Sequence, residues 1–229
     1  GKAVAITAKA EIYPEAEIEF AEAVAHDLGV RHVLVEVDPL ALKEFVENPP
    51  DRCYYCKRAV FAEIRKQADA LGVEHVADGT NADDASDWRP GSRAIEELGV
   101  RSPLKEAGLT KADIRELSRR AGLPTADLPS GACLASRFPY GSSISSEQLT
   151  LVGKAEAALE GLGFAGLRVR HHGAIARVEL APEDIPRAAE PETRKQIAEA
   201  VKALGFKYVA LDLEGYRTGS LNEVLDRKD

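Results

Sequence analysis

The sequence predicts an α/β protein, with a parallel-sheet domain over residues 1–128 and a small α+β domain over residues 129–229. In the first part, short runs rich in valine and isoleucine alternate with amphipathic helical stretches, an order that predicts right-handed crossovers in a parallel sheet. In the second part, a predicted hairpin and its flanking helices follow a change of composition near residues 125–145. With 229 residues, 45% of them hydrophobic, the chain can bury a core in one or two domains.

The elements of the first part follow from hydrophobic spacing and from residues that start or stop helices. Apolar residues at helical spacing predict a helix over 15–28, which Pro14 starts and Gly29 ends. Thr110, with Asp113 three positions on, predicts a capping box. The predicted strands cover 2–8, 30–37 and 75–77, the predicted helices cover 15–28, 40–46, 51–71, 93–98 and 110–121, and residues 101–104 are expected to form an extended link.

The second part is predicted in the same way. Ser145 is a good N-cap for a helix that runs to residue 162. Two runs of strand-forming residues, 167–171 and 175–180, predict a hairpin, and His171 and His172 are interpreted as turn residues rather than as a base or a metal site. Helical stretches over 182–184 and 193–204, a strand over 207–213 and a polar tail over 215–229 complete the chain.

Charge and cysteine content exclude several classes of protein. The net charge of −8 argues against a large nucleic-acid footprint, which needs clustered lysine and arginine, but allows a local basic patch for a small anion. Three cysteines, two of them in a C-x-x-C, suit a reducing cytoplasm better than a secreted disulfide framework. No apolar run reaches the length of a membrane span, and no signal peptide is expected. We therefore expect a cytoplasmic protein without nucleic-acid or membrane partners.

The most distinctive stretch is residues 129–141, PSGACLASRFPYG, which we call the central loop. Its glycines and two prolines predict an ordered loop rather than a helix or a strand. It carries Cys133 among small residues, with Arg137 four positions on, and a nearby cation favours the nucleophilic thiolate. A buried structural thiol is the commoner fate of a lone cysteine, so the loop alone leaves both interpretations open.

Cys53 and Cys56 lie one helical turn apart at a predicted helix start, where the helix dipole, Lys57 and Arg58 favour thiolates. A structural zinc site needs four ligands, and the chain has three cysteines. A [4Fe-4S] cluster held by Cys53, Cys56 and Cys133 fits this arithmetic and would leave one iron open to another ligand. A surface redox pair or a fortuitous spacing is the alternative.

Six motifs together resemble the LarE family of ATP-dependent sulfur transferases, which build the nickel-pincer cofactor of lactate racemase. They are RCYYCKR at 52–58, DGTNADD followed by DWRPG at 78–91, RSPL at 101–104, GACLASRFPYG at 131–141, LRVRHHG at 167–173 and LDLEGYRTGSLNE at 211–223. The resemblance covers essentially the whole chain. It implies the fold of the PP-loop ATP pyrophosphatases: a Rossmann-like sheet domain of the adenine nucleotide alpha hydrolase kind, followed by a small α+β domain. The chain is similar to hexamer-forming members, so a homo-oligomer is expected.

The resemblance also implies a reaction. ATP, with Mg²⁺, adenylates a carboxylate of pyridinium-3,5-biscarboxylic acid mononucleotide, and a sulfur nucleophile then displaces AMP to leave a thiocarboxylate. Adenylation is needed because a carboxylate is a poor electrophile, and the sulfur must then lie within reach of the activated carbon. In sacrificial members the cysteine that matches Cys133 gives up its own sulfur and becomes dehydroalanine. Members with three cysteines hold a [4Fe-4S] cluster that delivers sulfide, and this chain resembles them.

Residues for the nucleotide are expected at the ends of strands. The resemblance points to Thr7 and Ala8, at the end of the first strand, and to Gly79, Thr80 and Asn81 in the loop after the strand at 75–77. Ligands of open parallel sheets bind at this edge.

Residues for the anionic mononucleotide are expected around Cys133. Arg168 and Arg170 alternate on one strand face, and guanidinium groups suit a phosphate or a carboxylate. Glu179, on the partner strand, could orient them. We expect Arg137, Arg168 and Arg170 to line one pocket with the Cys133 sulfur at its mouth. A solvated strand face is the alternative for the strand pair.

The chain departs from the family pattern at one point. The Ser-Gly-Gly-x-Asp-Ser loop, whose backbone amides cradle the phosphates of ATP, is found nowhere in the sequence. The sequence also starts at Gly1, contains no methionine and opens within a predicted strand. We therefore expect that a strand and the phosphate loop are missing before Gly1, and that the chain as given binds ATP poorly.

Two other classes are weighed against the sulfur transferase. Another PP-loop enzyme is one, but ammonia-using amidotransferases of the NAD or GMP synthase kind need no cysteine, and tRNA thiolases want a basic surface. A non-catalytic remnant is the other, motivated by the missing phosphate loop. The cysteine and arginine sets argue against such a decayed protein.

Overall fold

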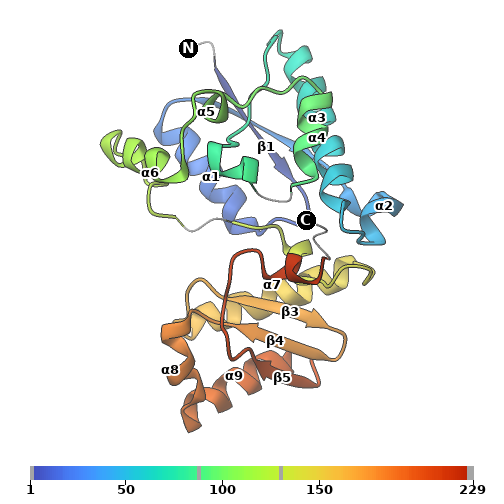
Figure 1. The fold of residues 1–229 in the computed structure, drawn as a ribbon, viewed down its shortest axis with the longest axis vertical. Helices are drawn as coiled ribbons and strands as arrows, with labels where there is room; N and C mark the ends of the chain where they lie inside the picture. Colours follow the sequence, from blue (N-terminus) through green and yellow to red (C-terminus); the bar gives the residue numbers. More distant parts are fainter. Residues whose placement is uncertain (1–2, 87–88, 129–130, 226–229) are drawn as a thin grey trace. The chain divides into compact units, whose positions relative to one another are not determined.

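The computed structural model describes residues 3–86, 89–128 and 131–225, and it divides the chain into two compact units (Figure 1). The first unit comprises residues 1–45 and 51–131, and the second comprises residues 46–50 and 132–229. The chain therefore enters the second unit for five residues, returns to the first, and enters the second again after Gly131. The predicted boundary at 128/129 and the functions assigned to the two parts stay predictions.

The first unit is built on a strand–helix–strand motif. Strand β1 (Val4–Lys9) pairs in parallel with β2 (Arg31–Glu36), and α1 (Glu15–Asp27) connects them. The predicted parallel pairing is therefore confirmed for the first two strands. Further helices follow: η1 (Pro39–Ala41), α2 (Lys43–Val46), α3 (Arg52–Ala70), η2 (Ala82–Ser86), α4 (Gly91–Glu97), α5 (Pro103–Glu106) and α6 (Lys111–Arg120).

Helix α3 is the central helix of this unit, because it contacts both strands and packs along α4. The approach to α4 is close: a Cβ atom at Gly91 would lie 2.9 Å from Lys57 Cγ and 3.3 Å from the carbonyl oxygen of Cys53. The glycine thus lets the first turns of α3 and α4 touch. Phe61 and Ile64 of α3 are buried in the core of the unit.

Two sequence predictions for this unit are wrong in part. The strand predicted at 75–77 is reduced to one parallel bridge, between Ala77 and Arg101. Asp78 N still donates to the carbonyl oxygen of Arg101 at 2.9 Å, and the Asp78 carboxylate accepts hydrogen bonds from Thr80 and Ser102. The extended link predicted over 101–104 is found at Arg101, in the bridge, and at Ser102, but Pro103 and Leu104 enter α5. Pro103 stands at its first turn, where a fixed φ and a missing N–H cost nothing.

The second unit contains a three-stranded sheet. Strands β3 (Arg168–His172) and β4 (Ile175–Glu179) form the predicted antiparallel hairpin, and β5 (Tyr208–Leu211) pairs in parallel with β4. Helices α7 (Ser146–Gly161) and α9 (Pro191–Ala203) contact each other, α7 contacts β3, and α9 contacts β5. The remaining helices are η3 (Leu134–Arg137), η4 (Pro182–Asp184), α8 (Ile185–Ala189) and η5 (Ser220–Val224). The largest fully buried apolar side chains here include Phe138, Phe164, Leu149, Leu159 and Leu167.

Helix starts follow the sequence closely. Thr110 and Asp113 form the predicted capping box of α6, in which each side chain bonds to the backbone of the other residue. Ser145 caps α7 as predicted, and Gln148 completes a second capping box there. Each box satisfies two N–H groups that the first helical turn leaves without partners.

The segment Val46–Pro50 is the part of the second unit that lies far from the rest in sequence. Asn48 is fully buried in the left-handed conformation, with φ of 55°. Its side-chain amide donates to the carbonyl oxygens of Pro139 at 2.8 Å and Ser142 at 3.0 Å, and its own carbonyl accepts from Gly141 N at 2.8 Å. This segment therefore fixes the turn at the end of the central loop.

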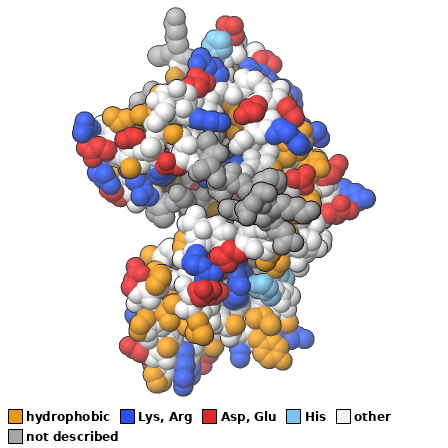
Figure 2. All heavy atoms as spheres, viewed as in Figure 1, with side chains coloured by type: hydrophobic (Ala, Val, Ile, Leu, Met, Phe, Trp, Pro, Cys, Tyr) orange, Lys and Arg blue, Asp and Glu red, His pale blue; other side chains and the backbone are white. Residues whose placement is uncertain are grey.

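Lysine and arginine side chains stand beside acidic ones on the face shown in Figure 2, and the described residues visible there form no single large basic patch. This mixture fits the net charge of −8. Within the described ranges, no helix is both long and apolar enough to cross a bilayer.

Candidate functional site

The central loop forms one turn of 3₁₀-helix where the sequence predicted no helix. Cys133 stands at the N-cap of η3, and its carbonyl oxygen accepts a hydrogen bond from Ser136 N at 3.0 Å. Leu134 and Ala135 are buried and anchor the turn, whereas the side chain of Cys133 is partly exposed. Pro129 and Ser130, the first residues of the loop, lie outside the described part of the chain.

Arg137 holds this turn from within. Its guanidinium is only 3% exposed and donates to the carbonyl oxygens of Ala132 at 2.7 Å and Cys133 at 3.2 Å. Its other edge forms a two-point ion pair with Glu156 of α7, at 2.9 Å from Nε and 2.8 Å from Nη2. Glu156 also accepts from the backbone N–H of Val169 in β3 at 2.8 Å. The Arg137–Glu156 pair therefore ties the backbone at Cys133 to a helix and to the sheet.

Arg168 and Arg170 lie on one face of β3, as residues two apart on a strand must. Arg170 is buried and donates to Glu179 at 2.7 Å and to the carbonyl oxygen of Ser136 at 2.8 Å. Glu179 accepts from Arg177 as well, at 2.8 Å, so one buried carboxylate serves two arginines. Burial, and then the like charge of Arg137, lower the pKa of Arg168. Arg137, Arg168, Arg170 and Glu179 are thus gathered in one unit with Cys133.

His171 and His172 belong to β3 and not to a turn, which corrects the sequence interpretation. The His171 ring is buried, stacks on Phe138 at 5.1 Å between centroids and touches Phe206 at 5.6 Å. Burial lowers the pKa of both histidines, and the positive charge of Arg177 lowers that of His172 further. His171 is therefore a neutral part of the core.

The C-x-x-C motif stands in the first turn of α3, as predicted. Cys56 is buried and Cys53 is partly exposed. Among the described residues, no group of three or more His, Cys, Asp and Glu side chains is arranged to hold a metal ion. Cys53 and Cys56 belong to the first unit and Cys133 to the second, so a cluster held by all three stays a prediction.

The DGTNADD loop is held together by its own side chains. Besides its bond to Thr80, Asp78 accepts from Ser102 Oγ at 2.7 Å. Asn81 is buried, donates its backbone N–H to Asp84 at 2.9 Å and accepts from Asp83 N at 3.0 Å. Gly79 stands between these bonded residues, and a Cβ there would meet no atom within 4 Å. The loop is therefore a preformed structure at the end of the Ala77 bridge.

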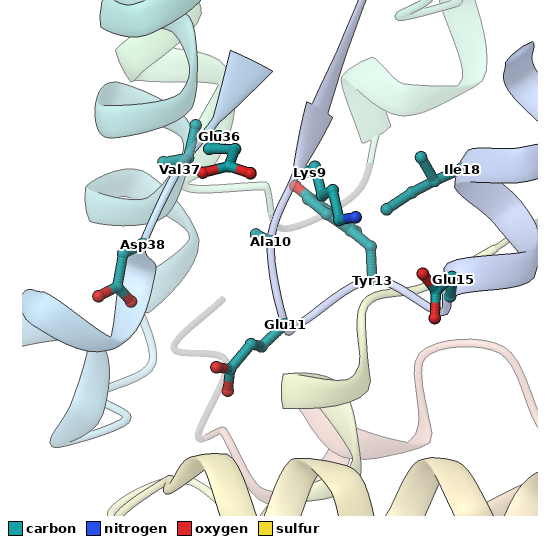
Figure 3. A pocket seen from close by; sticks show the side chains of 9 residues that line it. All are labelled: Lys9, Ala10, Glu11, Tyr13, Glu15, Ile18, Glu36, Val37 and Asp38. Atoms are coloured by element: carbon teal, nitrogen blue, oxygen red, sulfur yellow. The ribbon is translucent and has the colours of Figure 1, made fainter. Parts of the chain in front are cut away.

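A hollow of about 560 Å³ opens where β1 and β2 end (Figure 3). One side is formed by the end of β1 and the start of α1, and the other by the end of β2. Its lining residues are Lys9, Ala10, Glu11, Tyr13, Glu15, Ile18, Glu36, Val37 and Asp38. The four carboxylates exceed the single lysine, so the hollow favours a neutral or cationic group over a phosphate. The predicted nucleotide residues Thr7 and Ala8 directly precede this lining, and the Thr7 hydroxyl is bonded to His32 at 2.9 Å.

Sequence reasoning missed several side chains of the arginine cluster. Glu156 left a signal: it occupies the 149, 152, 156, 159 spacing of buried α7 residues, where a charge needs a buried partner. Tyr216 and Ser220, which contact Arg168 and Arg170, lie in the motif at 211–223, but its polar composition predicted no regular element and gave no sign of these contacts.

Comparison with known proteins adds an independent line of support. A scan against protein-family models finds no match. The uncharacterized protein slr1717 of Synechocystis is 43% identical over 98% of this chain and 84% of its own length. An uncharacterized protein of Methanocaldococcus jannaschii is 31% identical over 78% of this chain and 69% of its own.

A third relative has a named activity. The pyridinium-3,5-bisthiocarboxylic acid mononucleotide synthase of Lactiplantibacillus plantarum is 34% identical over 231 residues, which cover 97% of this chain and 80% of that protein. Identity of this degree over nearly the full length, together with the six motifs, leads to one conclusion: the chain belongs to the LarE family.

Proposed function

We propose that this protein is an ATP-dependent sulfur transferase that converts pyridinium-3,5-biscarboxylic acid mononucleotide into its thiocarboxylate form. Two observations support the proposal: similarity to a named synthase over nearly the whole chain, and a partly exposed Cys133 on a turn fixed by the buried Arg137–Glu156 pair. A nucleophile held by rigid elements needs less reorganisation before it reacts.

The reaction proceeds in two stages. A substrate carboxylate oxygen attacks the α-phosphorus of ATP, pyrophosphate leaves with Mg²⁺, and an acyl adenylate forms. Sulfur then attacks the acyl carbon, and the carbon–oxygen bond to AMP breaks. In the sacrificial version the sulfur is Cys133 Sγ; loss of the Cys133 Cα proton then breaks the Cβ–S bond and leaves a thiocarboxylate and dehydroalanine. In the catalytic version, Cys53, Cys56 and Cys133 would hold a [4Fe-4S] cluster that supplies sulfide.

For the nucleotide we propose the edge of the first unit where β1, β2 and the Ala77 bridge end, with Thr7, Ala8, Gly79, Thr80 and Asn81 as binding residues. The acidic lining of the neighbouring hollow supports a role for it toward the uncharged adenosine part of ATP. Its carboxylates would repel the triphosphate, so the phosphates need donors elsewhere.

For the substrate we propose Arg137, Arg168, Arg170 and Glu179. The buried ion pairs of Arg137 and Arg170 support a positioning role for these two. Arg168 is the arginine we propose to meet the anionic substrate. A homo-oligomer, such as a hexamer, belongs to the proposal and is tested by light scattering after gel filtration.

The experiment combines ATP, Mg²⁺ and the biscarboxylic acid mononucleotide with anaerobically purified protein and follows AMP, pyrophosphate and thiocarboxylate by mass spectrometry. Cys133→Ser should still release pyrophosphate but form no thiocarboxylate. Cys53→Ser, measured beside iron and acid-labile sulfide content, separates the sulfur sources. It should have no effect if Cys133 is sacrificed, and Cys133 should then lose the mass of H₂S. Thiocarboxylate formation by Cys133→Ser at the wild-type rate would refute the proposal.

A further inference from the structure

The C-terminal segment, which we define as Glu214–Val224, folds back onto the second unit after β5 (red in Figure 1). Tyr216 N donates to the carbonyl oxygen of Leu180, just beyond β4, at 2.7 Å. Gly215 has φ of +71°, and a Cβ there would lie 2.7 Å from the same oxygen. The segment is thus seated on the unit by a close backbone contact that requires glycine.

The segment also contacts the arginines of β3 and the turn at the end of the central loop. The Tyr216 ring centroid lies 4.9 Å from Cζ of Arg168. Ser220 Oγ accepts from Arg170 Nη2 at 3.1 Å, and Asn222 Oδ1 accepts from the Tyr140 hydroxyl at 2.8 Å. One segment therefore contacts both arginines and a residue seven positions after Cys133.

The cluster that the segment contacts is rich in arginine. The segment's own Arg217, Glu214 and Glu223 add a net charge of −1 beside it. The cluster itself has four guanidinium groups and three carboxylates, seven side chains with a net charge of +1. They are Arg137, Arg168, Arg170, Arg177, Glu156, Glu179 and Asp212. Burial and the charge of Arg137 disfavour the charged form of Arg168. A bound anion beside Arg168 would relieve both effects.

A tyrosine ring over a guanidinium suits an arginine that must bind an oxyanion. Arg168 Nη1 donates to the carbonyl oxygen of Leu167 at 2.6 Å, so an oxyanion would be met at the Nε and Nη2 edge of the group. The contact also restricts a long, flexible side chain, so less freedom is lost when an anion binds. A phosphate offers several acceptor oxygens to such an edge.

We propose that Tyr216 is a positioning residue for an oxyanion site at Arg168, and that this site takes the phosphate monoester group of a mononucleotide. The identity of the mononucleotide rests on the proposed function, whereas the oxyanion site rests on the contacts above. The C-terminal segment then contributes a positioning residue to the site.

The test uses the full chain and inorganic phosphate as the probe, titrated by calorimetry at low ionic strength. Tyr216→Leu removes the ring face and should weaken phosphate binding roughly 2- to 12-fold, the range for a long side chain that must otherwise be ordered on binding. Tyr216→Phe keeps the face and should restore binding. The matched control is Tyr208→Leu, a tyrosine of β5 that is 64% exposed, which should bind phosphate like wild type.

A second variant keeps the test decisive if Tyr216→Leu lowers the melting temperature. Arg168→Lys preserves the charge but not the planar group, and in that background Tyr216→Leu should cause little further loss. In the sulfur-transfer assay, Tyr216→Leu should raise KM for the mononucleotide more than it lowers kcat.

Three results would overturn the inference: no phosphate binding by wild type, unchanged affinity in Tyr216→Leu, or an equal loss in Tyr208→Leu. A different result bears on the proposed function alone. If the phosphate pattern holds but wild type transfers no sulfur, the oxyanion site stands and the proposed reaction fails.

Discussion

Replacing Glu156 with glutamine tests whether the buried ion pair holds the turn at Cys133. Three N–H donors converge on this carboxylate: Arg137 Nε and Nη2 and the backbone N–H of Val169, at 2.8 to 2.9 Å. Glutamine has nearly the same shape but one acceptor oxygen, so its NH₂ must face a donor. Arg137, at 3% exposure, is then left as a buried cation without a counter-charge.

Breaking a buried ion pair by removing one partner costs about 3–5 kcal/mol. We expect Glu156→Gln to lower the free energy of unfolding by about this amount, measured by urea denaturation with circular dichroism. Hydrogen exchange on peptides from α7 and β3 assigns the loss to the second unit, because the two units could unfold separately. The matched control, Glu116→Gln, removes an exposed carboxylate 2.8 Å from Arg120 and should change little.

The double variant Glu156→Gln with Arg137→Met removes the stranded cation and should regain part of the lost stability. In the sulfur-transfer assay it should still be slow, because the hydrogen bonds from Arg137 to the carbonyl oxygens of Ala132 and Cys133 are lost. The reasoning is refuted if Glu156→Gln unfolds as easily as the exposed control, or if sulfur transfer persists at the wild-type rate in the double variant.

Three further predictions concern the second unit. Burial keeps the pKa of His171 below 6.5, so the unfolded chain binds more protons below that pH and the protein should lose stability on acidification. The slope of melting temperature against pH should therefore be smaller in His171→Leu than in wild type, and an unchanged slope would contradict this. Asn48→Ala strips two part-buried carbonyl oxygens of a donor and should cost about 1–3 kcal/mol in total in urea denaturation, whereas a loss under 1 kcal/mol would mean that water replaces the amide. Gly215→Ala places a methyl group against the Leu180 oxygen at positive φ and should cost at least about 1–2 kcal/mol of stability. An unchanged melting temperature would mean that the segment moves aside without cost.

The sequence predicted the elements whose causes are local. The capping box at Thr110, the N-cap at Ser145, the β3–β4 hairpin and the start of α3 follow from residues within a few positions of each other. The strand at 75–77 was mispredicted because its pairing depends on a distant segment, and it ends where Asp78 finds side-chain partners.

The sequence predicted which arginines belong to the candidate site, but not which carboxylates they pair with. Arg137, Arg168 and Arg170 were expected together, and the structure gathers them in one unit. Their anions were not all foreseen: Glu179 lies across the hairpin and could be found by register, whereas Glu156 sits nineteen positions from Arg137 on a separate helix. The helical spacing of α7 turns this glutamate inward, but tertiary packing alone decides that Arg137 is its partner.

The five-residue excursion at Val46–Pro50 has a consequence for how the protein is made. Asn48 leaves the ribosome about 90 positions before the carbonyl groups it will bind, so at typical synthesis rates it waits roughly 5–20 s for them. The first unit can therefore be synthesised completely before Val46–Pro50 finds its partners in the second unit. A fragment beginning at Ala132 would never acquire it, and the turn at Pro139 and Ser142 would face water. The second unit is thus a product of both halves of the gene, and dissecting it requires a permuted chain or a supplied peptide.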